Sequence, residues 1–281
     1  HEARLGPRLR GGAGPVNPAR HSVRHGFYLR EKAPAEPRGT IVFVHGLGES
    51  GLCFEDLLGR PELAAWRLIV PDLVGYGRTP RDGRPRGLAD HVTDLVGLLD
   101  ALGIARPVVL GHSMGGVVAL MLAERRPDRA ALVIDVDGNT SPGDCVYSGR
   151  AAALAFADFA AGGHAAMLDG IYRAGLADAA QRGYYASQRL CDPATFHRNS
   201  TELLAQSQPE DLARRRAALP VPLVYIAGAP GGACRRSRTL LDAAGVEVVE
   251  IRPAGHWPFI DRPDDFTAAL VRVLDRPGGP A

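Results

Sequence analysis

The chain has 281 residues, of which 46% are hydrophobic and 23% are charged, and its formal net charge is only +2. This length and apolar content suit one large domain with a full core. The near-neutral balance argues against a nucleic-acid-binding protein, which concentrates basic residues on one face. No apolar run is long enough to cross a bilayer and no secretion signal is visible, so we expect a cytoplasmic protein, although the printed chain begins with His1 rather than Met.

Short apolar strands and longer helical segments alternate along most of the chain. A segment rich in Gly, Pro and Arg comes first, over 1–20, and is predicted to be a flexible arm. Strands are then expected at 21–31, 40–46, 66–73, 106–113, 130–138, 221–228 and 246–257, and helices at 88–103, after Ser113 and at 263–276. Continuous apolar strands separated by helices indicate an α/β fold with a mostly parallel, doubly wound sheet covered on both faces.

This alternation stops between about 139 and 218. The segment is rich in Ala, helical in character and without a convincing strand. We therefore predict an α/β core formed by 21–138 and 219–281, with a helical cap over 139–218 inserted before the last two strands. A cap in that place would cover the carboxyl edge of the sheet, where ligands bind in open α/β folds.

The sequence GHSMG at 111–115 places a serine between a predicted strand and a predicted helix. The backbone at such a corner is strained, and side chains on either side would collide with the neighbouring strands and the helix, which explains Gly111 and Gly115. The turn projects the Ser113 hydroxyl above the sheet and directs the Met114 amide toward the same space. Ser113 is therefore a candidate nucleophile.

A second glycine-rich turn, FVHGLG at 43–48, follows an earlier predicted strand. Its glycines let the backbone approach a ligand closely, which would bring the Leu47 amide beside that of Met114. Two such amides can bind the negative oxygen of a transition state, so Leu47 and Met114 form the predicted oxyanion hole. His45, at the strand end beside these donors, is expected to be structural.

A base for the serine is expected in the loop after the last predicted strand. His256 lies there, in the segment PAGHWPFIDRPDDF. Such a loop can bring an imidazole within hydrogen-bond reach of Ser113. With nine histidines in the chain, His256 is selected by its place rather than by its residue type.

Four segments in chain order, HGLG, PDLVGYGRT, GHSMGG and GHWPFIDRPDDF, resemble the α/β-hydrolase fold family. The resemblance covers nearly the whole chain, from about 22 to 275. It implies a serine nucleophile at Ser113, a base at His256 and an oxyanion pocket from Leu47 and Met114. It also implies that Asp72, in the second segment, shapes the site without taking part in catalysis.

The acid of the expected triad is absent from the position that family members commonly use, just after the strand before the histidine strand. The sequence there reads AGAPGGACRR, at 227–236, without Asp or Glu. The family's second location is the end of the strand after the nucleophile helix, where Asp135 and Asp137 point to the same face. Asp137, next to Gly138 at the carboxyl end of that strand, is the predicted acid, and Asp135 is the alternative.

These residues together predict a serine hydrolase that needs no metal and no organic cofactor. It would cleave an ester-type bond of a small, largely apolar substrate through an acyl-enzyme on Ser113. Thioesterase, lactonase and carbon–carbon bond hydrolase activities stay open, because the same residues serve all of them. A non-catalytic small-molecule-binding protein on a hydrolase scaffold is the alternative of another class. The sequence also leaves open whether the chain forms a homo-oligomer.

The predicted cap supplies the expectation of an apolar substrate. Its candidate pocket residues are Phe156, Phe159, Met167, Tyr172, Tyr184, Tyr185 and Phe196. The four cysteines are scattered without a CxxC pair, which argues against a metal site and favours free thiols, with a bridge between Cys145 and Cys191 as the alternative.

Overall fold

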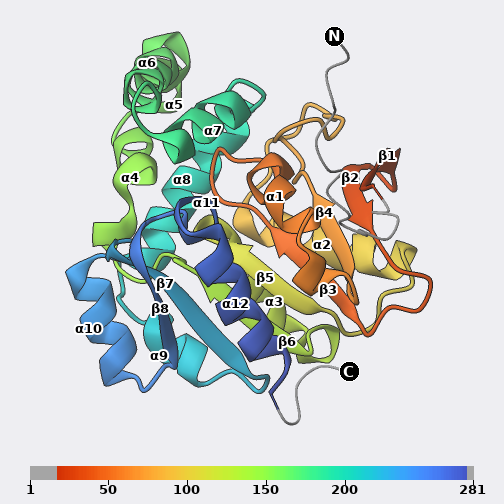
Figure 1. Cartoon of the computed structure of the whole chain (residues 1–281). Coiled ribbons are helices and arrows are strands. Elements are labelled where there is room, and N and C mark those ends of the chain that lie inside the picture. The colour runs from red at the N-terminus through yellow and green to blue at the C-terminus, as the bar shows by residue number, and fades with distance from the viewer. Residues whose placement is uncertain (1–17, 277–281) are drawn as a thin grey trace, which may run out of the picture.

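The computed structural model describes residues 18–276 and contains one eight-stranded sheet, in the order β1-β2-β4-β3-β5-β6-β7-β8. The strands are β1 (Arg20–Arg24), β2 (Phe27–Lys32), β3 (Thr40–Val44), β4 (Arg67–Pro71), β5 (Val108–His112), β6 (Leu132–Val136), β7 (Leu223–Gly231) and β8 (Val248–Gly255). β2 pairs antiparallel with β1 and β4, and every other pair is parallel. The predicted α/β class with a mostly parallel sheet is thus confirmed (Figure 1).

The first strand differs from the expectation in two ways. Residues 1–17 of the arm predicted over 1–20 lie outside the described residues. At its other end the prediction is wrong, because Arg20 is the first residue of β1. The single strand predicted at 21–31 is wrong, because a hairpin divides it into β1 and β2. His25 and Gly26 form the turn with φ values of 52° and 80°. Two consecutive positive φ values suit a two-residue hairpin turn, because its twist matches that of the paired strands.

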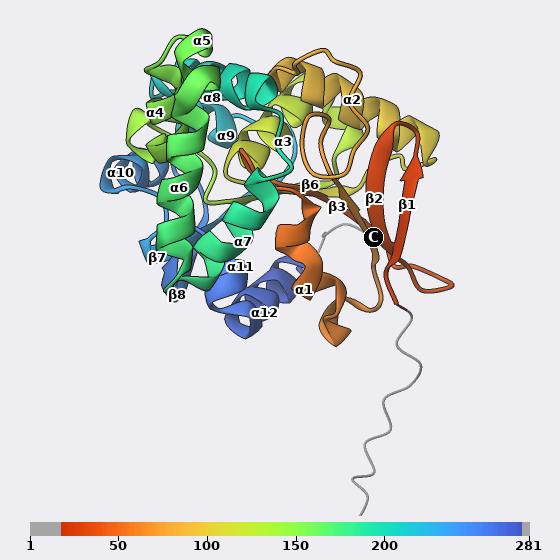
Figure 2. The same ribbon diagram turned by 90° about the horizontal axis from the view of Figure 1, so that it is seen from above.

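Helices cover both faces of the sheet. α2 (Leu88–Ala101) and α3 (Met114–Arg125) lie on one face, and α1 (Glu55–Leu58), α11 (Pro258–Asp261) and α12 (Pro263–Leu274) lie on the other, as Figure 2 shows. Successive residues of β5 therefore enter different cores: Val108 and Leu110 pack with the α12 side, and Val109 packs with α3. This two-sided burial is why the strands read as continuous apolar runs.

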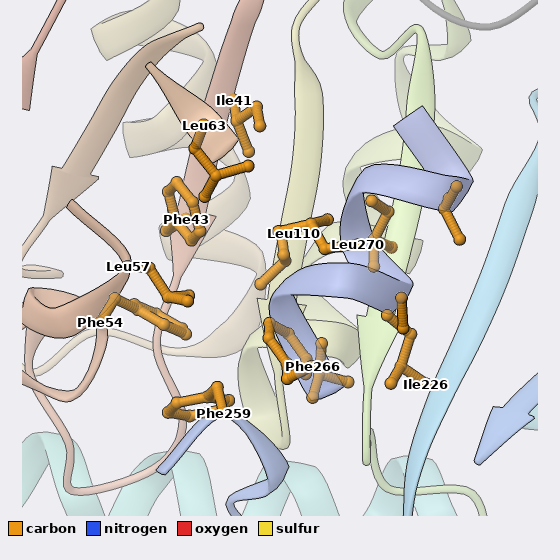
Figure 3. Packing of buried hydrophobic residues seen from close by; sticks show 14 of the residues in the cluster. Ile41, Phe43, Phe54, Leu57, Leu63, Leu110, Ile226, Phe259, Phe266 and Leu270 are labelled. Atoms are coloured by element: carbon orange, nitrogen blue, oxygen red, sulfur yellow. The ribbon is translucent and has the colours of Figure 1, made fainter. Parts of the chain in front are cut away.

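The core on the α12 side is dense with large side chains. Phe266 and Leu270 of α12 lie over Leu110 and Ile226 of the sheet, and Phe54 and Phe259 pack beside them (Figure 3). The regular helical spacing of the apolar residues in 263–276 correctly predicted this buried face.

The helical insertion begins after β6 and ends before β7. It consists of α4 (Val146–Ala152), α5 (Phe156–Asp158), a π-helical turn (Phe159–Gly163), α6 (His164–Gly175), α7 (Ala179–Gln188), α8 (Pro193–Ser207) and α9 (Leu212–Ala217); α10 (Arg235–Ala243) follows β7. Figure 1 shows α4 to α7 gathered beyond one end of the sheet. Within 18–276 no single helix is long and apolar enough to span a membrane; only α4 and the segment Phe156–Gly175 pass as a pair, and they are bent by 111°.

The cysteines form no cross-link. Cys53, Cys145, Cys191 and Cys234 are all free thiols. The free-thiol expectation is therefore confirmed, and the alternative of a bridge between Cys145 and Cys191 is not realised.

A buried ion pair ties the end of the insertion to the sheet. Arg216 of α9 donates from Nε to Asp135 Oδ2 on β6 at 2.7 Å, and both side chains have 0% exposure. The same guanidinium donates to the Asn139 carbonyl at 3.0 Å and the Thr140 hydroxyl at 3.1 Å. The Asp135 carboxylate thus helps to anchor α9 against the carboxyl end of β6 through its ion pair with Arg216.

We expect Arg216→Met to lower the free energy of unfolding by about 3–5 kcal/mol, because it leaves the Asp135 carboxylate buried without its cation. Urea unfolding of the wild type and the variant measures this loss. The double variant Asp135→Asn/Arg216→Met removes the stranded charge and should recover part of the loss. A double variant as unstable as the single one would contradict the assignment.

Candidate functional site

The backbone at Ser113 adopts the strained turn that the sequence predicts. Ser113 lies between β5 and α3 with φ 54° and ψ −120°. A Cβ on Gly111 would collide with the carbonyl of Gly115, and one on Gly115 would collide with the carbonyl of Val44. The two glycines therefore allow α3 to leave the strand at once, which is what places the serine at the end of the sheet.

A cavity of about 420 Å³ lies at this end of the sheet, beneath the inserted helices. Four of the five predicted site residues line it: Leu47, Ser113, Asp137 and His256. The fifth, Met114, is fully buried directly after Ser113 and is not among the lining residues. Tyr147, Gln181 and Tyr184 line the cavity from the insertion.

The two backbone amides predicted to bind an oxyanion have no hydrogen-bond acceptor within the described chain. Over 18–276, neither the Leu47 amide nor the Met114 amide donates a hydrogen bond to another residue. The Leu47 turn also lies against the nucleophile, because a Cβ on Gly46 would be 3.1 Å from the Cβ of Ser113. Free backbone donors beside a hydroxyl are suited to bind a developing negative oxygen.

Asp137 is held by the loop that lacks an acid of its own. Its Oδ2 accepts from the Gly228 amide at 2.8 Å, and its Oδ1 accepts from the Ala233 amide at 2.8 Å. A Cβ on Gly232 would collide with the same carboxylate. The segment 227–236 thus wraps around a carboxylate supplied by the neighbouring strand. Burial raises the pKa of Asp137 to about 7, although both amide hydrogen bonds oppose the shift.

His256 is half-buried in the loop between β8 and α11. Its ring centroid is 4.8 Å from that of His112 and 5.2 Å from that of Trp257. Burial, followed by the positive charge of His112, lowers the pKa of His256 to about 3, so the free imidazole is neutral and able to accept a proton. In the described chain no hydrogen bond or ion pair joins this ring to Ser113 or Asp137. The structure brings the three side chains into one cavity without linking them, and the triad stays a prediction.

Sequence reasoning missed three residues of the site. Glu49, His112 and Trp257 also line the cavity, and all three are buried. His112 and Trp257 are the immediate neighbours of two residues that the motifs did identify, Ser113 and His256. Their adjacency was the only signal, and it says nothing about which of them contact one another.

The expectation of an aromatic cavity lining is largely wrong. Of the seven candidate side chains, only Tyr184 lines the cavity. Phe159 and Phe196 stack on each other with centroids 5.8 Å apart and are fully buried, whereas Phe156 and Tyr172 are 46% and 50% exposed. The insertion uses its aromatic residues for its own packing, and polar side chains such as Asn139, Ser148 and Gln181 face the cavity instead.

Three further candidates have structural contacts. Asp72 is fully buried and accepts from the Arg30 guanidinium at 2.6 Å and the Gly51 amide at 2.7 Å. His45 accepts from the Leu73 amide at 3.0 Å. Neither residue lines the cavity, and neither does Asp135, the alternative acid.

Comparison with known proteins relates the chain to a family of enzymes. A family model described as the alpha/beta hydrolase family matches residues 41–270. Lipase LipV of Mycobacterium tuberculosis is 35% identical over 112 residues, which are 40% of this chain and 41% of the lipase. A putative carbamate hydrolase, RutD of Caulobacter vibrioides, is 35% identical over 120 residues, which are 41% of this chain and 43% of that protein. The chain thus spans less than half of these curated relatives.

Two solved structures show the same fold over nearly the whole chain. The enol-lactonase of Burkholderia xenovorans has a TM-score of 0.70 and 23% identity, covering 92% of this chain and 100% of that one. A thermophilic esterase of Thermogutta terrifontis has a TM-score of 0.68 and 21% identity, covering 88% and 92%. At these identities the likeness is one of fold.

We expect Asp137→Asn to gain stability relative to the wild type as the pH rises from 5 to 8. The pKa of Asp137 is raised from 3.8 to about 7 in the folded chain, so its protonated form stabilises the fold at low pH and this contribution is lost as the pH rises through 7. Since one pKa unit corresponds to about 1.4 kcal/mol, the wild type should lose on the order of 2–3 kcal/mol that an asparagine cannot lose.

Urea unfolding of both proteins at pH 5 and pH 8 measures this difference. The charged neighbours that act on Asp137, His112 and Asp144, are present in both proteins. A difference in unfolding free energy that does not change between the two pH values would contradict the raised pKa.

Proposed function

Since the chain belongs to the alpha/beta hydrolase family, we propose that it is a serine hydrolase that cleaves an ester-type bond of a small substrate through an acyl-enzyme on Ser113. The observation that carries this proposal is the shared cavity of Ser113, His256, Asp137 and the free Leu47 amide. Two of the relatives, a lipase and a putative carbamate hydrolase, are named for reactions in which an acyl carbon is attacked, which supports the proposal.

In the proposed reaction the substrate carbonyl lies over the Ser113 hydroxyl. Oγ bonds to the carbonyl carbon while its proton passes to His256, and the carbonyl oxygen becomes negative between the amides of Leu47 and Met114. When the intermediate collapses, the bond to the alkoxy group breaks and that group leaves as an alcohol, with the proton from His256. Water then attacks the acyl-enzyme with His256 as base, which releases the carboxylic acid and restores Ser113.

Asp137 would orient His256 and stabilise its positive form. Each carboxylate oxygen can accept two hydrogen bonds, so Asp137 can accept one from His256 while it keeps those from Gly228 and Ala233. This requires the His256 ring to turn toward Asp137 and Ser113. Such bonds are often long or poorly aligned before substrate binds, and they tighten in the complex.

We expect a fluorophosphonate probe to label the wild-type protein at Ser113, and the label to disappear in Ser113→Ala and His256→Ala. The reason is that the probe phosphonylates a serine, with loss of fluoride, only when a base removes the serine proton. Mass spectrometry of the labelled peptide identifies the site. Asp137→Asn should lower kcat toward a short p-nitrophenyl ester by about 10³–10⁴, because the imidazole loses its orienting anion.

An unlabelled, folded wild-type protein with no turnover of the p-nitrophenyl ester would favour the alternative of a small-molecule-binding protein. Near-normal turnover in Asp137→Asn would remove that residue from the triad and leave the serine and histidine in place.

The charge of the cavity narrows the substrate class. Among the described residues that line it are five carboxylates and no Lys or Arg; the carboxylates are Glu49, Asp137, Asp144, Asp178 and Asp261. Asp178 is exposed at the start of α7, where its Oδ1 caps the Ala180 amide at 2.8 Å. The charge of Glu49 is balanced by His112, which also lines the cavity, but Asp144, Asp178 and Asp261 leave an excess of acidic groups there. Such an excess repels anions, so we infer that the substrate is neutral or cationic rather than a carboxylate.

We expect kcat/KM for a neutral aryl ester to exceed that for an ester of similar size bearing a terminal carboxylate, and Asp178→Asn to narrow the gap by about 3–10-fold, the size of one partly screened charge interaction. Asparagine caps a helix as well as aspartate does, so α7 should be preserved. Asp158→Asn, an exposed acid on α5 outside the cavity lining, is the control for net charge. An unchanged gap in Asp178→Asn would refute the role of that charge.

A further inference from the structure

One buried carboxylate contacts three separate parts of the candidate site. Glu49 is 2% exposed. Its Oε2 accepts from the Gly46 amide at 2.6 Å and is paired with His112 Nδ1 at 2.9 Å. Its Oε1 accepts from the indole nitrogen of Trp257. The thiol of Cys53, at 3.6 Å, completes the surroundings of Oε2.

The three nitrogen donors share one property. Each is the immediate chain neighbour of a residue proposed to take part in the reaction: Gly46 precedes Leu47, His112 precedes Ser113, and Trp257 follows His256. The carboxylate therefore connects the oxyanion turn, the nucleophile turn and the histidine loop. Two of these segments are distant in the sequence: His112 is 63 residues from Glu49, and Trp257 is 208 residues from it.

The contacts of His112 show that it is a cation. Its Nδ1 faces the Glu49 carboxylate, and its Nε2 lies 2.7 Å from the carbonyl oxygen of His256, which can only accept. Two acceptors require two N–H groups when Glu49 is ionised. Burial lowers the pKa of His112, but the charge and hydrogen bond of Glu49 outweigh it and the net shift is upward. Burial likewise opposes ionisation of Glu49, yet His112 and the other donors hold its pKa at about 2.

This ion pair extends the network to the base itself. Through its second nitrogen, His112 holds the backbone carbonyl of His256, while Glu49 holds the next residue, Trp257, by accepting from its indole nitrogen. A buried pair of this kind is costly to break, because either charge alone would remain without solvent or partner. Its geometry is therefore fixed more firmly than that of the surface loops around it.

We propose that Glu49 is a positioning residue, which sets the placement of Leu47, Ser113 and His256 relative to one another through its bonds to Gly46, His112 and Trp257. The inference rests on the proposed hydrolase function of the same cavity. Glu49 does not touch the substrate in this role. It limits the freedom of the three segments, so that the reacting groups meet without a further loss of entropy on binding.

The first test is Glu49→Gln in the full chain, assayed with a neutral p-nitrophenyl ester. Glutamine keeps the shape but offers one acceptor oxygen, and its NH₂ faces the N–H of His112 or Trp257. We expect kcat to fall by about 10–10²-fold, the effect of a misplacement near 1 Å, with little change in KM. Leu270→Ala, a fully buried core position in α12, is the matched control: it should lower the melting temperature and keep kcat.

The second test separates positioning from general stability, and its single variant, Trp257→Phe, can be assayed even if Glu49→Gln does not fold. Trp257→Phe keeps an aromatic ring but removes the indole N–H, and it should lower kcat less than Glu49→Gln. In the double variant the two losses should not multiply, because both substitutions disturb the same hydrogen-bonded network. Multiplying losses, or wild-type kcat in both single variants, would overturn the positioning role.

The two proposals fail in different ways. A wild-type protein that neither reacts with the fluorophosphonate probe nor turns over the ester removes the hydrolase function, and with it the role of Glu49. An active, labelled wild type with unchanged kcat in Glu49→Gln and Trp257→Phe removes only the positioning role.

Discussion

The close packing of α3 on the sheet is the constraint from which the site follows. All residues from Met114 to Ala123 are buried, so this helix has no solvent face to adjust. Gly115 lies against the carbonyls of Val44 and His45, and Gly116 lies against the Asp135 carboxylate. With the helix fixed in this way, the chain can join β5 to α3 only through the positive φ of Ser113. A non-glycine residue in such a conformation costs about 1–3 kcal/mol, which the burial of the helix offsets.

The sheet itself continues this constraint to the predicted acid. The Ser113 amide donates to the Val136 carbonyl at 2.9 Å, and the Asp137 amide donates to the Ile226 carbonyl at 2.9 Å. Ladder hydrogen bonds thus extend past the ends of β5 and β6 and fix both residues in register. Asp137, like Ser113, has a positive φ, of 46°. Strain at two neighbouring strand ends is typical of a place where structure has been shaped for function rather than for stability.

Sequence reasoning reached those features that contiguous residues encode. The strand, sharp turn and helix around Ser113 stand side by side in the chain, and the apolar runs of the parallel strands are readable without knowing their partners. The hairpin at His25–Gly26 was missed because a single glycine after a histidine is a weak turn signal. Glu49 was missed for a deeper reason: its partners come from distant segments, and only the folded sheet brings them together.

The cap is a second case in which the sequence predicted the elements but not their contacts. Its helical character was clear from composition, but which face of each helix meets the core depends on how the helices pack on one another. Phe159 and Phe196 therefore became core residues, although their aromatic character suggested a substrate pocket. Helical periodicity identifies an apolar face and does not say whether protein or ligand will cover it.

The buried carboxylates at this edge of the sheet differ in one respect that bears on the chemistry. Glu49 is paired with His112, Asp72 with Arg30 and Asp135 with Arg216. Over the described residues Asp137 forms no ion pair, and burial therefore raises its pKa although two backbone amides oppose the shift. An anion in that position is poorly compensated until a cation forms beside it. An imidazolium at His256 would supply that cation at the moment of proton transfer, so the unpaired state of Asp137 is itself an argument for its place in the triad.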